Sequence, residues 1–220
     1  MTAMRVLFPT DGSAGAQEAL ELMIASFDPT AVETVEVLAV IPRVTRWPGA
    51  GREDHGPMTV IDAAHRDAAK GTVHSVCERL EAAGFRTVAT LLSGHPAETI
   101  VLHARAQWPD LIIVGTRGLS GAHRQGVGSV SGKVARYAPT SELVARTPDP
   151  IRRIVLGYDA SPDAELALDQ LAGLPLREAT TVTVCTVYEV AAPLASGVAP
   201  TMVAEVEAAY RDELLEARAV

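Results

Sequence analysis

The chain has 220 residues, of which 48% are hydrophobic and 21% are charged, so it contains enough apolar material to form a globular core. Its formal net charge of −8 argues against sequence-independent binding to nucleic acid or to anionic membranes, because both need clusters of Lys and Arg. No apolar run approaches the roughly 18 residues of a membrane-spanning helix, and the N-terminus leads directly into a predicted strand. We therefore expect a cytoplasmic protein with neither a membrane span nor a signal peptide.

The first part of the chain alternates short apolar strands with amphipathic helices. Residues 4–9 (MRVLFP) are a predicted buried strand, and residues 10–13 (TDGS) have the composition of a turn. Apolar residues at helical spacing follow over 16–27, and residues 34–42 (TVEVLAVIP) form the second predicted strand. Residues 43–57 are rich in Gly, Pro and charge, which predicts a surface loop.

The same alternation continues through the middle of the chain. The predicted elements there are a helix over 59–83, a strand over 85–92, a helix from Pro96 to Trp108, a strand over 110–115, a helix over 130–138 and a fifth strand over 142–146. Strictly alternating strands and helices predict a parallel, doubly wound α/β sheet with helices on both faces.

A partial repeat follows residues 147–150 (TPDP), which have the composition of a linker. The segment IRRIVLGYDASPDAELALDQL aligns with AMRVLFPTDGSAGAQEALEL, so that Asp159 matches Asp11 and Ser161 matches Ser13. Residues 181–190 then match the second strand, and residues 204–217 have the pattern of the next helix.

Two domains are therefore expected. Residues 1–147 form a full domain that carries the candidate site, and residues 151–220 form a partial second copy with its first two strands and two helices. Two parallel strands covered by two helices are not expected to be stable alone. The partial copy then belongs either to a truncated form of a tandem protein or to a segment that docks on its neighbour or on another chain.

The cysteines and histidines show no motif spacing. Cys77 and Cys185 are far apart in sequence, which predicts a reducing compartment and two small core residues. None of the six histidines has the spacing of a metal site, so we expect five to be solvated and regard His123 as a candidate phosphate contact.

The glycine-rich stretch VGTRGLSGAHRQGVGSVSGKV, residues 114–134, has the composition of a phosphate-binding loop. A Walker A loop is excluded, because Val127 stands where its first Gly is needed and Val134 where its Ser or Thr is needed. The dinucleotide fingerprint also fails, since the glycines are one residue too far apart and follow the fourth strand instead of the first.

The remaining pattern is Gly115, two residues, Gly118, nine residues, and then Gly128-Ser129. The first two glycines would let the backbone turn sharply and come close to a ligand. Ser129 would cap the next helix, whose N–H groups and dipole attract an anion.

This spacing, together with the preceding strand and the turn VLFPTDGS, resembles the universal stress protein domain. The resemblance implies the adenine nucleotide alpha hydrolase-like fold, with five parallel strands in the order 3-2-1-4-5. In the subclass with this glycine motif it also implies ATP bound at the carboxyl ends of the strands, with Mg2+ or Mn2+ bridging the phosphates. The resemblance covers residues 1 to about 147 fully and 151–220 in part.

The resemblance also implies roles for individual residues. Asp11 is expected to bind the ribose or to contact the metal indirectly, and it is also a candidate cap of the first helix. From its position between two glycines, and not from the resemblance, Arg117 is expected either to reach a phosphate or to be solvated. The full set of expected contacts is Pro9, Thr10 and Asp11 for the adenosine, Val40 for the adenine, and Gly115, Arg117, Gly118, Gly128, Ser129, Val130 and Ser131 for the phosphates.

Two features depart from the family pattern. Residues 140–142 (TSE) precede only Leu143 and Val144, where members usually have a more apolar fifth strand through which they often dimerise. The second copy has Gly157-Tyr158 in place of Pro9-Thr10 and no glycine loop in this sequence, so no complete nucleotide site is expected there. We expect a homodimer or self-association through the partial second domain.

Three functions follow as hypotheses. The first is an ATP-binding sensor or regulator, because no general base, nucleophile or metal cluster converges on the loop. The second is a weak ATPase or self-phosphorylating enzyme, with Asp11 orienting water and Ser129 or Ser131 as acceptor. The third is a nucleotide-free interaction scaffold that docks through the half repeat.

Overall fold

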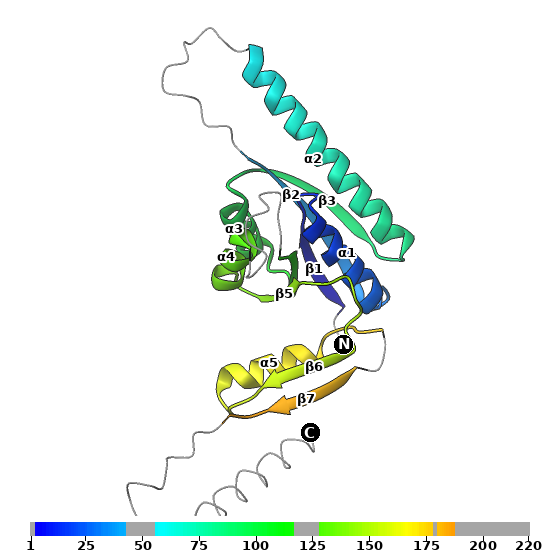
Figure 1. Cartoon of the computed structure of the whole chain (residues 1–220), viewed down its shortest axis with the longest axis vertical. Helices are drawn as coiled ribbons and strands as arrows, with labels where there is room; N and C mark the ends of the chain where they lie inside the picture. Colours follow the sequence, from blue (N-terminus) through cyan, green and yellow to red (C-terminus); the bar gives the residue numbers. More distant parts are fainter. Residues whose placement is uncertain (1–2, 43–55, 117–127, 178–179, 188–220) are drawn as a thin grey trace, which may run out of the picture.

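The computed structural model describes residues 3–42, 56–116, 128–177 and 180–187, without the side chains of residues 56–62 (Figure 1). In chain order the first nine elements are β1 (Met4–Pro9), α1 (Ala14–Ser26), β2 (Val32–Pro42), α2 (Gly56–Ala82), β3 (Thr87–Gly94), α3 (Pro96–Gln107), β4 (Leu111–Gly115), α4 (Ser129–Tyr137) and β5 (Ser141–Ala145). The elements predicted for the first domain are all present, with boundaries shifted by a few residues.

The five strands form one parallel sheet in the order β3-β2-β1-β4-β5. This confirms the predicted fold class and strand order. The central strands β1 and β4 are largely apolar and buried because both of their faces are covered, as is usual for parallel sheets.

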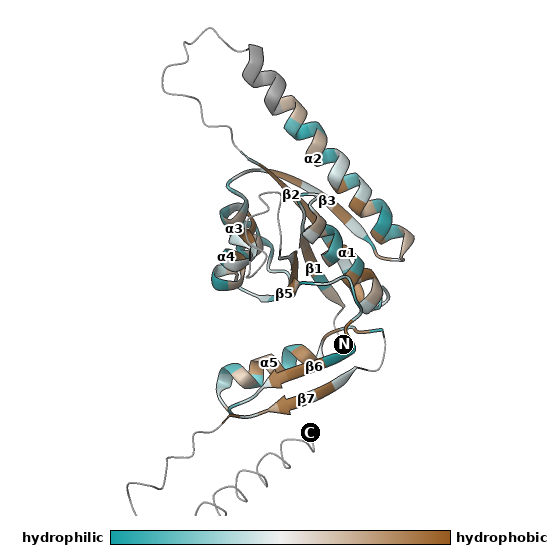
Figure 2. Ribbon diagram, in the orientation of Figure 1, coloured by the Kyte–Doolittle hydropathy of each residue, from teal (hydrophilic) through white to brown (hydrophobic). Residues whose placement is uncertain are grey.

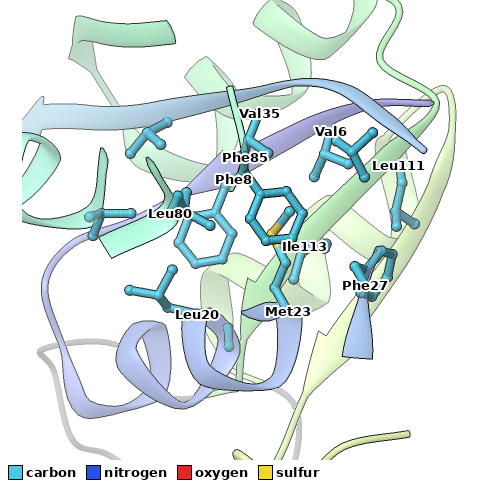
Figure 3. Close-up of a cluster of buried hydrophobic side chains, with 14 of the residues drawn as sticks. Val6, Phe8, Leu20, Met23, Phe27, Val35, Leu80, Phe85, Leu111 and Ile113 are labelled. Carbon is cyan, nitrogen blue, oxygen red and sulfur yellow. The ribbon is translucent and has the colours of Figure 1, made fainter. Parts of the chain in front are cut away.

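Alternate residues of the strands pack into two separate hydrophobic cores, one on each face of the sheet. On the first face, Phe8 and Ile113 pack with α1 and α2 in a cluster whose labelled side chains are shown in Figure 3. On the second face, Leu7 and Ile112 pack under α3 and α4. Because neighbouring residues of a strand point to opposite faces, consecutive apolar residues such as Leu7-Phe8 stabilise both cores at once.

A second, smaller sheet follows the linker. It pairs β6 (Arg153–Gly157) with β7 (Thr181–Cys185) in parallel, and α5 (Pro162–Ala172) connects the two strands. Apolar side chains of this sheet are exposed to solvent: Val155 is 71% exposed, and Figure 2 shows most of both strands as hydrophobic. The helix predicted over 204–217 lies outside the described residues.

The second sheet is joined to the first domain at the end of α1. Phe27 forms an antiparallel bridge with Leu176, the Asp28 amide donates to the Pro175 carbonyl at 2.8 Å, and the Arg177 amide donates to the Ser26 carbonyl at 2.7 Å. These contacts satisfy backbone groups that the end of a helix leaves without partners. They lie at the amino edge of the main sheet, opposite the edge where the candidate site is found.

Two expectations for single residues were wrong. Cys185 is exposed on β7 instead of buried, because the described part of the second copy leaves β7 uncovered, whereas Cys77 is buried as expected. His103 is also not a solvated surface residue. Its Nε2 lies 2.8 Å from the Glu36 carboxylate, and its side chain is only 13% exposed between α3 and β2.

The cysteines give a direct test of this packing. Burial raises the pKa of the Cys77 thiol, and only the thiolate is reactive. We expect iodoacetamide at pH 7.5 to modify Cys185 at least about tenfold faster than Cys77 in the native protein. Peptide mass spectrometry over time measures both rates, and Cys185→Ser should remove the fast phase. Equal rates at the two thiols would contradict this packing.

Among the described residues, no helix combines the length and the apolar character that crossing a membrane requires.

Candidate functional site

The candidate site lies at the carboxyl edge of the sheet, between β1 and β4. β1 continues through α1 to β2 on one side, while β4 lies on its other side, so the direction of winding reverses between these two strands. Open α/β sheets bind ligands at such a position, because the loops that leave the two strands diverge there. The predicted contacts on β1, on β4 and at the start of α4 all map to this edge.

The turn after β1 is held by its own side chains. The Gly12 amide donates to Thr10 Oγ1 at 3.3 Å, and the Ser13 amide donates to Asp11 Oδ1 at 3.0 Å. Gly12 has a φ of 74°, a left-handed conformation that favours glycine. Ser13 caps α1 by accepting from the Ala16 amide at 3.3 Å, so the alternative role of Asp11 as the cap of this helix was wrong. Asp11 is exposed beside the cap.

The second copy repeats this turn. The Ser161 amide donates to Asp159 Oδ1 at 3.0 Å, and Ser161 Oγ accepts from the Ala164 amide at 3.1 Å. Hydrogen bonds from the side chain and backbone of Ser161 hold the pKa of Asp159 below its usual value. The aligned segments therefore share the same local structure at the start of α5 and of α1.

Gly115 ends β4 directly against the first turn of α1. A Cβ atom at this position would lie 2.2 Å from the Gly15 carbonyl oxygen and 2.8 Å from the Ala16 amide nitrogen. The absent side chain thus makes room for the first turn of α1, a packing reason that differs from the predicted close approach to a ligand. Gly15 was missed in the sequence, although a glycine in the first turn of a helix, where it costs stability, was a signal of close packing.

Gly128, not Ser129, is the N-cap of α4, so the predicted cap was wrong. A Cβ atom on Gly128 would lie 2.4 Å from the Thr116 carbonyl oxygen. The glycine therefore lets the start of α4 rest against the backbone that leaves β4. Thr116 was also missed; its amide donates to the Ala145 carbonyl at 3.1 Å and its side chain is buried.

The cap of α4 differs from those of α1 and α5. Serine side chains cap the latter two helices, whereas no side chain caps α4 within the part of the chain that the structure describes. The first amides of a helix need partners and carry its positive partial charge. The start of α4 is thus suited to receive an anion.

The three residues after Gly128 have different environments. Ser129 is exposed at the first position of α4, and Val130 packs against the core beneath the helix. Ser131 is buried, and its hydroxyl donates to the Gly128 carbonyl at 3.3 Å. Ser129 is therefore the hydroxyl of this turn that faces outward.

The predicted adenosine contacts lie at the same edge. Thr10 follows Pro9 at the end of β1, and its amide donates to the Leu38 carbonyl of β2 at 2.8 Å. Val40 lies two residues farther along β2, half-buried against the core beneath α3 and α4. Arg117, Gly118 and His123 lie outside the described residues.

Comparisons with known proteins agree with this architecture. Residues 2–146 and 150–220 both match the model of the Universal stress protein family. The universal stress protein MJ0531 of Methanocaldococcus jannaschii is 30% identical over 146 residues, which are 66% of this chain and 82% of that protein.

Solved structures show the same fold. The universal stress protein UspA from Lactobacillus plantarum has 25% identity and a TM-score of 0.52, covering 66% of this chain and 99% of its own. A universal stress protein from Archaeoglobus fulgidus has a TM-score of 0.65 at 21% identity, covering 96% of this chain and 76% of its own. The second likeness includes both copies and concerns the fold alone.

Proposed function

Because this chain belongs to the universal stress protein family, we propose that it binds ATP at the carboxyl edge between β1 and β4 and acts as a nucleotide-dependent regulator. The observation that carries the proposal is the start of α4. Gly128 places this helix against Thr116 without a side-chain cap, so its first amides can bind the phosphates.

The other contacts follow from the positions of the strands. Pro9, Thr10 and Asp11 would line the adenosine, and Val40 would contact the adenine from the end of β2. Asp11 is the exposed carboxylate of this turn and would bind the ribose hydroxyls. Gly115, Arg117 and Gly118 would complete the phosphate loop, and Mg2+ would be held through the phosphate oxygens.

The proposed domains follow the two matches of the family model. Residues 1–147 would form the complete domain with the nucleotide site, and residues 151–220 a partial second domain. The repeated Asp-x-Ser turn at Asp159 and Ser161 supports this assignment.

Calorimetry with ATP and Mg2+ tests the proposal through Ser129→Asp. An aspartate at the first position of α4 stabilises a helix by about 0.3–1 kcal/mol, so the variant should fold at least as well as the wild type. The same negative charge would repel a phosphate bound at the helix start. We expect the affinity for ATP to fall at least about tenfold, or about 1.4 kcal/mol.

Lys133→Gln is the matched control, because it changes the net charge by the same amount on the same helix. Lys133 is exposed one turn farther on, so we expect an affinity close to that of the wild type. If the wild type showed no detectable binding of ATP, the proposed function would be refuted. Equal losses in the two variants would show that ATP responds to overall charge and is not bound at the start of α4.

A further inference from the structure

Glu142 is a carboxylate buried at the opposite end of α4. Both of its oxygens are shielded from solvent, and neither has a hydrogen-bond partner among the residues that the structure describes. Buried polar groups normally have partners, and an ionised carboxylate without one is costly. The nucleotide contacts proposed above do not use this residue.

Glu142 lies on the face of the sheet that α3 and α4 cover. It lies on β5 opposite Ile112, and it shares a face of the strand with Val144, which packs against the core beneath α3 and α4. α4 starts at the carboxyl edge and ends at the amino edge, where Ala138 closes its last turn by donating to the Val134 carbonyl at 2.8 Å. The carboxylate thus lies toward the C-terminal end of α4, whose dipole disfavours a negative charge.

The charged groups on the surrounding elements do not pair with Glu142. β4 carries no charged residue, and on α4 Lys133 and Arg136 are exposed. On α3, the Arg105 guanidinium donates to the Tyr137 carbonyl at 3.2 Å. On α1, which covers the other face, Glu21 pairs with Arg79 at 3.6 Å, and Glu18 has an interaction of its own.

We propose that Glu142 is a proton-controlled switch beneath α4. When it is neutral, α4 packs firmly on β4 and β5. When it is ionised, its unpaired charge loosens α4, including the first turn that faces the candidate site. α4 has nine residues and is therefore only about 13 Å long, so a displacement at one end reaches the other.

The sign of the pH dependence follows from burial, which raises the pKa of Glu142 from 4.5 to about 7. The folded chain retains a proton that the unfolded chain has already released. Stability from this group is therefore full below pH 4.5, falls as the pH rises from 4.5 to about 7, and changes little above. The loosening of α4 in the folded protein should appear as the pH passes through about 7.

Three measurements test the switch without nucleotide. Glu142→Gln has the same shape and no charge, and Glu33→Gln on β2 is an exposed control. In urea unfolding, the midpoint of the wild type minus that of Glu142→Gln should decrease as the pH rises from 5 to 7. The midpoint of the wild type minus that of Glu33→Gln should stay constant over the same range. The Gly132 and Ala138 amides, which donate within α4, should exchange hydrogen at equal rates in wild type and Glu142→Gln at pH 6, and severalfold faster in the wild type at pH 8.

The third measurement needs no variant. The carboxyl carbon of Glu142 in the wild type should titrate near pH 7 by NMR. A midpoint near 4.5, or equal exchange rates at pH 8, would overturn the proposal.

The link to the nucleotide rests on the proposed function and has its own readout. The ratio of ATP affinities of wild type and Glu142→Gln cancels the titration of the nucleotide itself. We expect this ratio to fall severalfold between pH 6 and pH 8. A constant ratio alongside changing exchange rates would refute the link but not the switch. Absence of ATP binding at every pH would refute the proposed function and the link, while the exchange rates would still decide on the switch.

Discussion

Gly115→Ala should destabilise the protein by about 3 kcal/mol or more, the upper end of the cost of overpacking a core. The added methyl group would lie 2.2 Å from the carbonyl oxygen and 2.3 Å from the carbonyl carbon of Gly15. Both atoms belong to the backbone of α1, so no side chain can rotate away. Either α1 or β4 must move, and each contributes to the buried core around Phe8 and Ile113.

Urea unfolding followed by circular dichroism measures this change. Gly71→Ala is the matched control, because a Cβ atom at Gly71 of α2 would meet nothing within 4 Å. That substitution should stabilise the protein by about 0.5–1 kcal/mol, since alanine favours a helix. A loss below about 0.5 kcal/mol for Gly115→Ala would mean that α1 and β4 are farther apart than described.

Gly128→Ala should weaken both the fold and the binding of ATP. Its methyl group would lie 2.4 Å from the Thr116 carbonyl oxygen. The φ of −60° is open to any residue, so the cost arises from this contact, from a second one at 3.2 Å to Ser131 Oγ, and from the poorer capping by alanine. We expect a loss of about 1–3 kcal/mol in unfolding free energy, because the start of α4 must move away from β4. The same movement should lower the ATP affinity at least about tenfold, as the helix amides leave their place.

Two measurements separate these effects. Urea unfolding reports the loss of stability, and calorimetry at a temperature where the variant is fully folded reports the loss of affinity. Gly157→Ala on β6, where a Cβ atom would meet nothing within 4 Å, should lower neither. Wild-type affinity in a destabilised Gly128→Ala would disprove the role of the helix start in holding phosphate.

Glycines illustrate how far a pattern of residues can be interpreted. The spacing from Gly115 to Gly128 predicted that the backbone comes close to another group at these glycines, and at both positions the structure shows a close backbone neighbour. The pattern could not tell what approaches. The neighbour of Gly115 is the backbone of α1, and the neighbour of Gly128 is Thr116. In each pair the two partners are distant in sequence and meet only in the folded chain.

The fold class, the order of the elements and the repeat at Asp159 and Ser161 could all be predicted from the sequence. These depend on local periodicity and on turn chemistry, both of which a chain carries residue by residue. The folded chain was needed to show that Gly128 caps α4, that His103 pairs with Glu36, and that Cys185 is exposed. It also shows that the carboxylate of Glu142, the acidic residue of a short strand, is buried without a partner among the described residues. Burial and pairing depend on which distant segments cover a residue, and the order of residues does not state this.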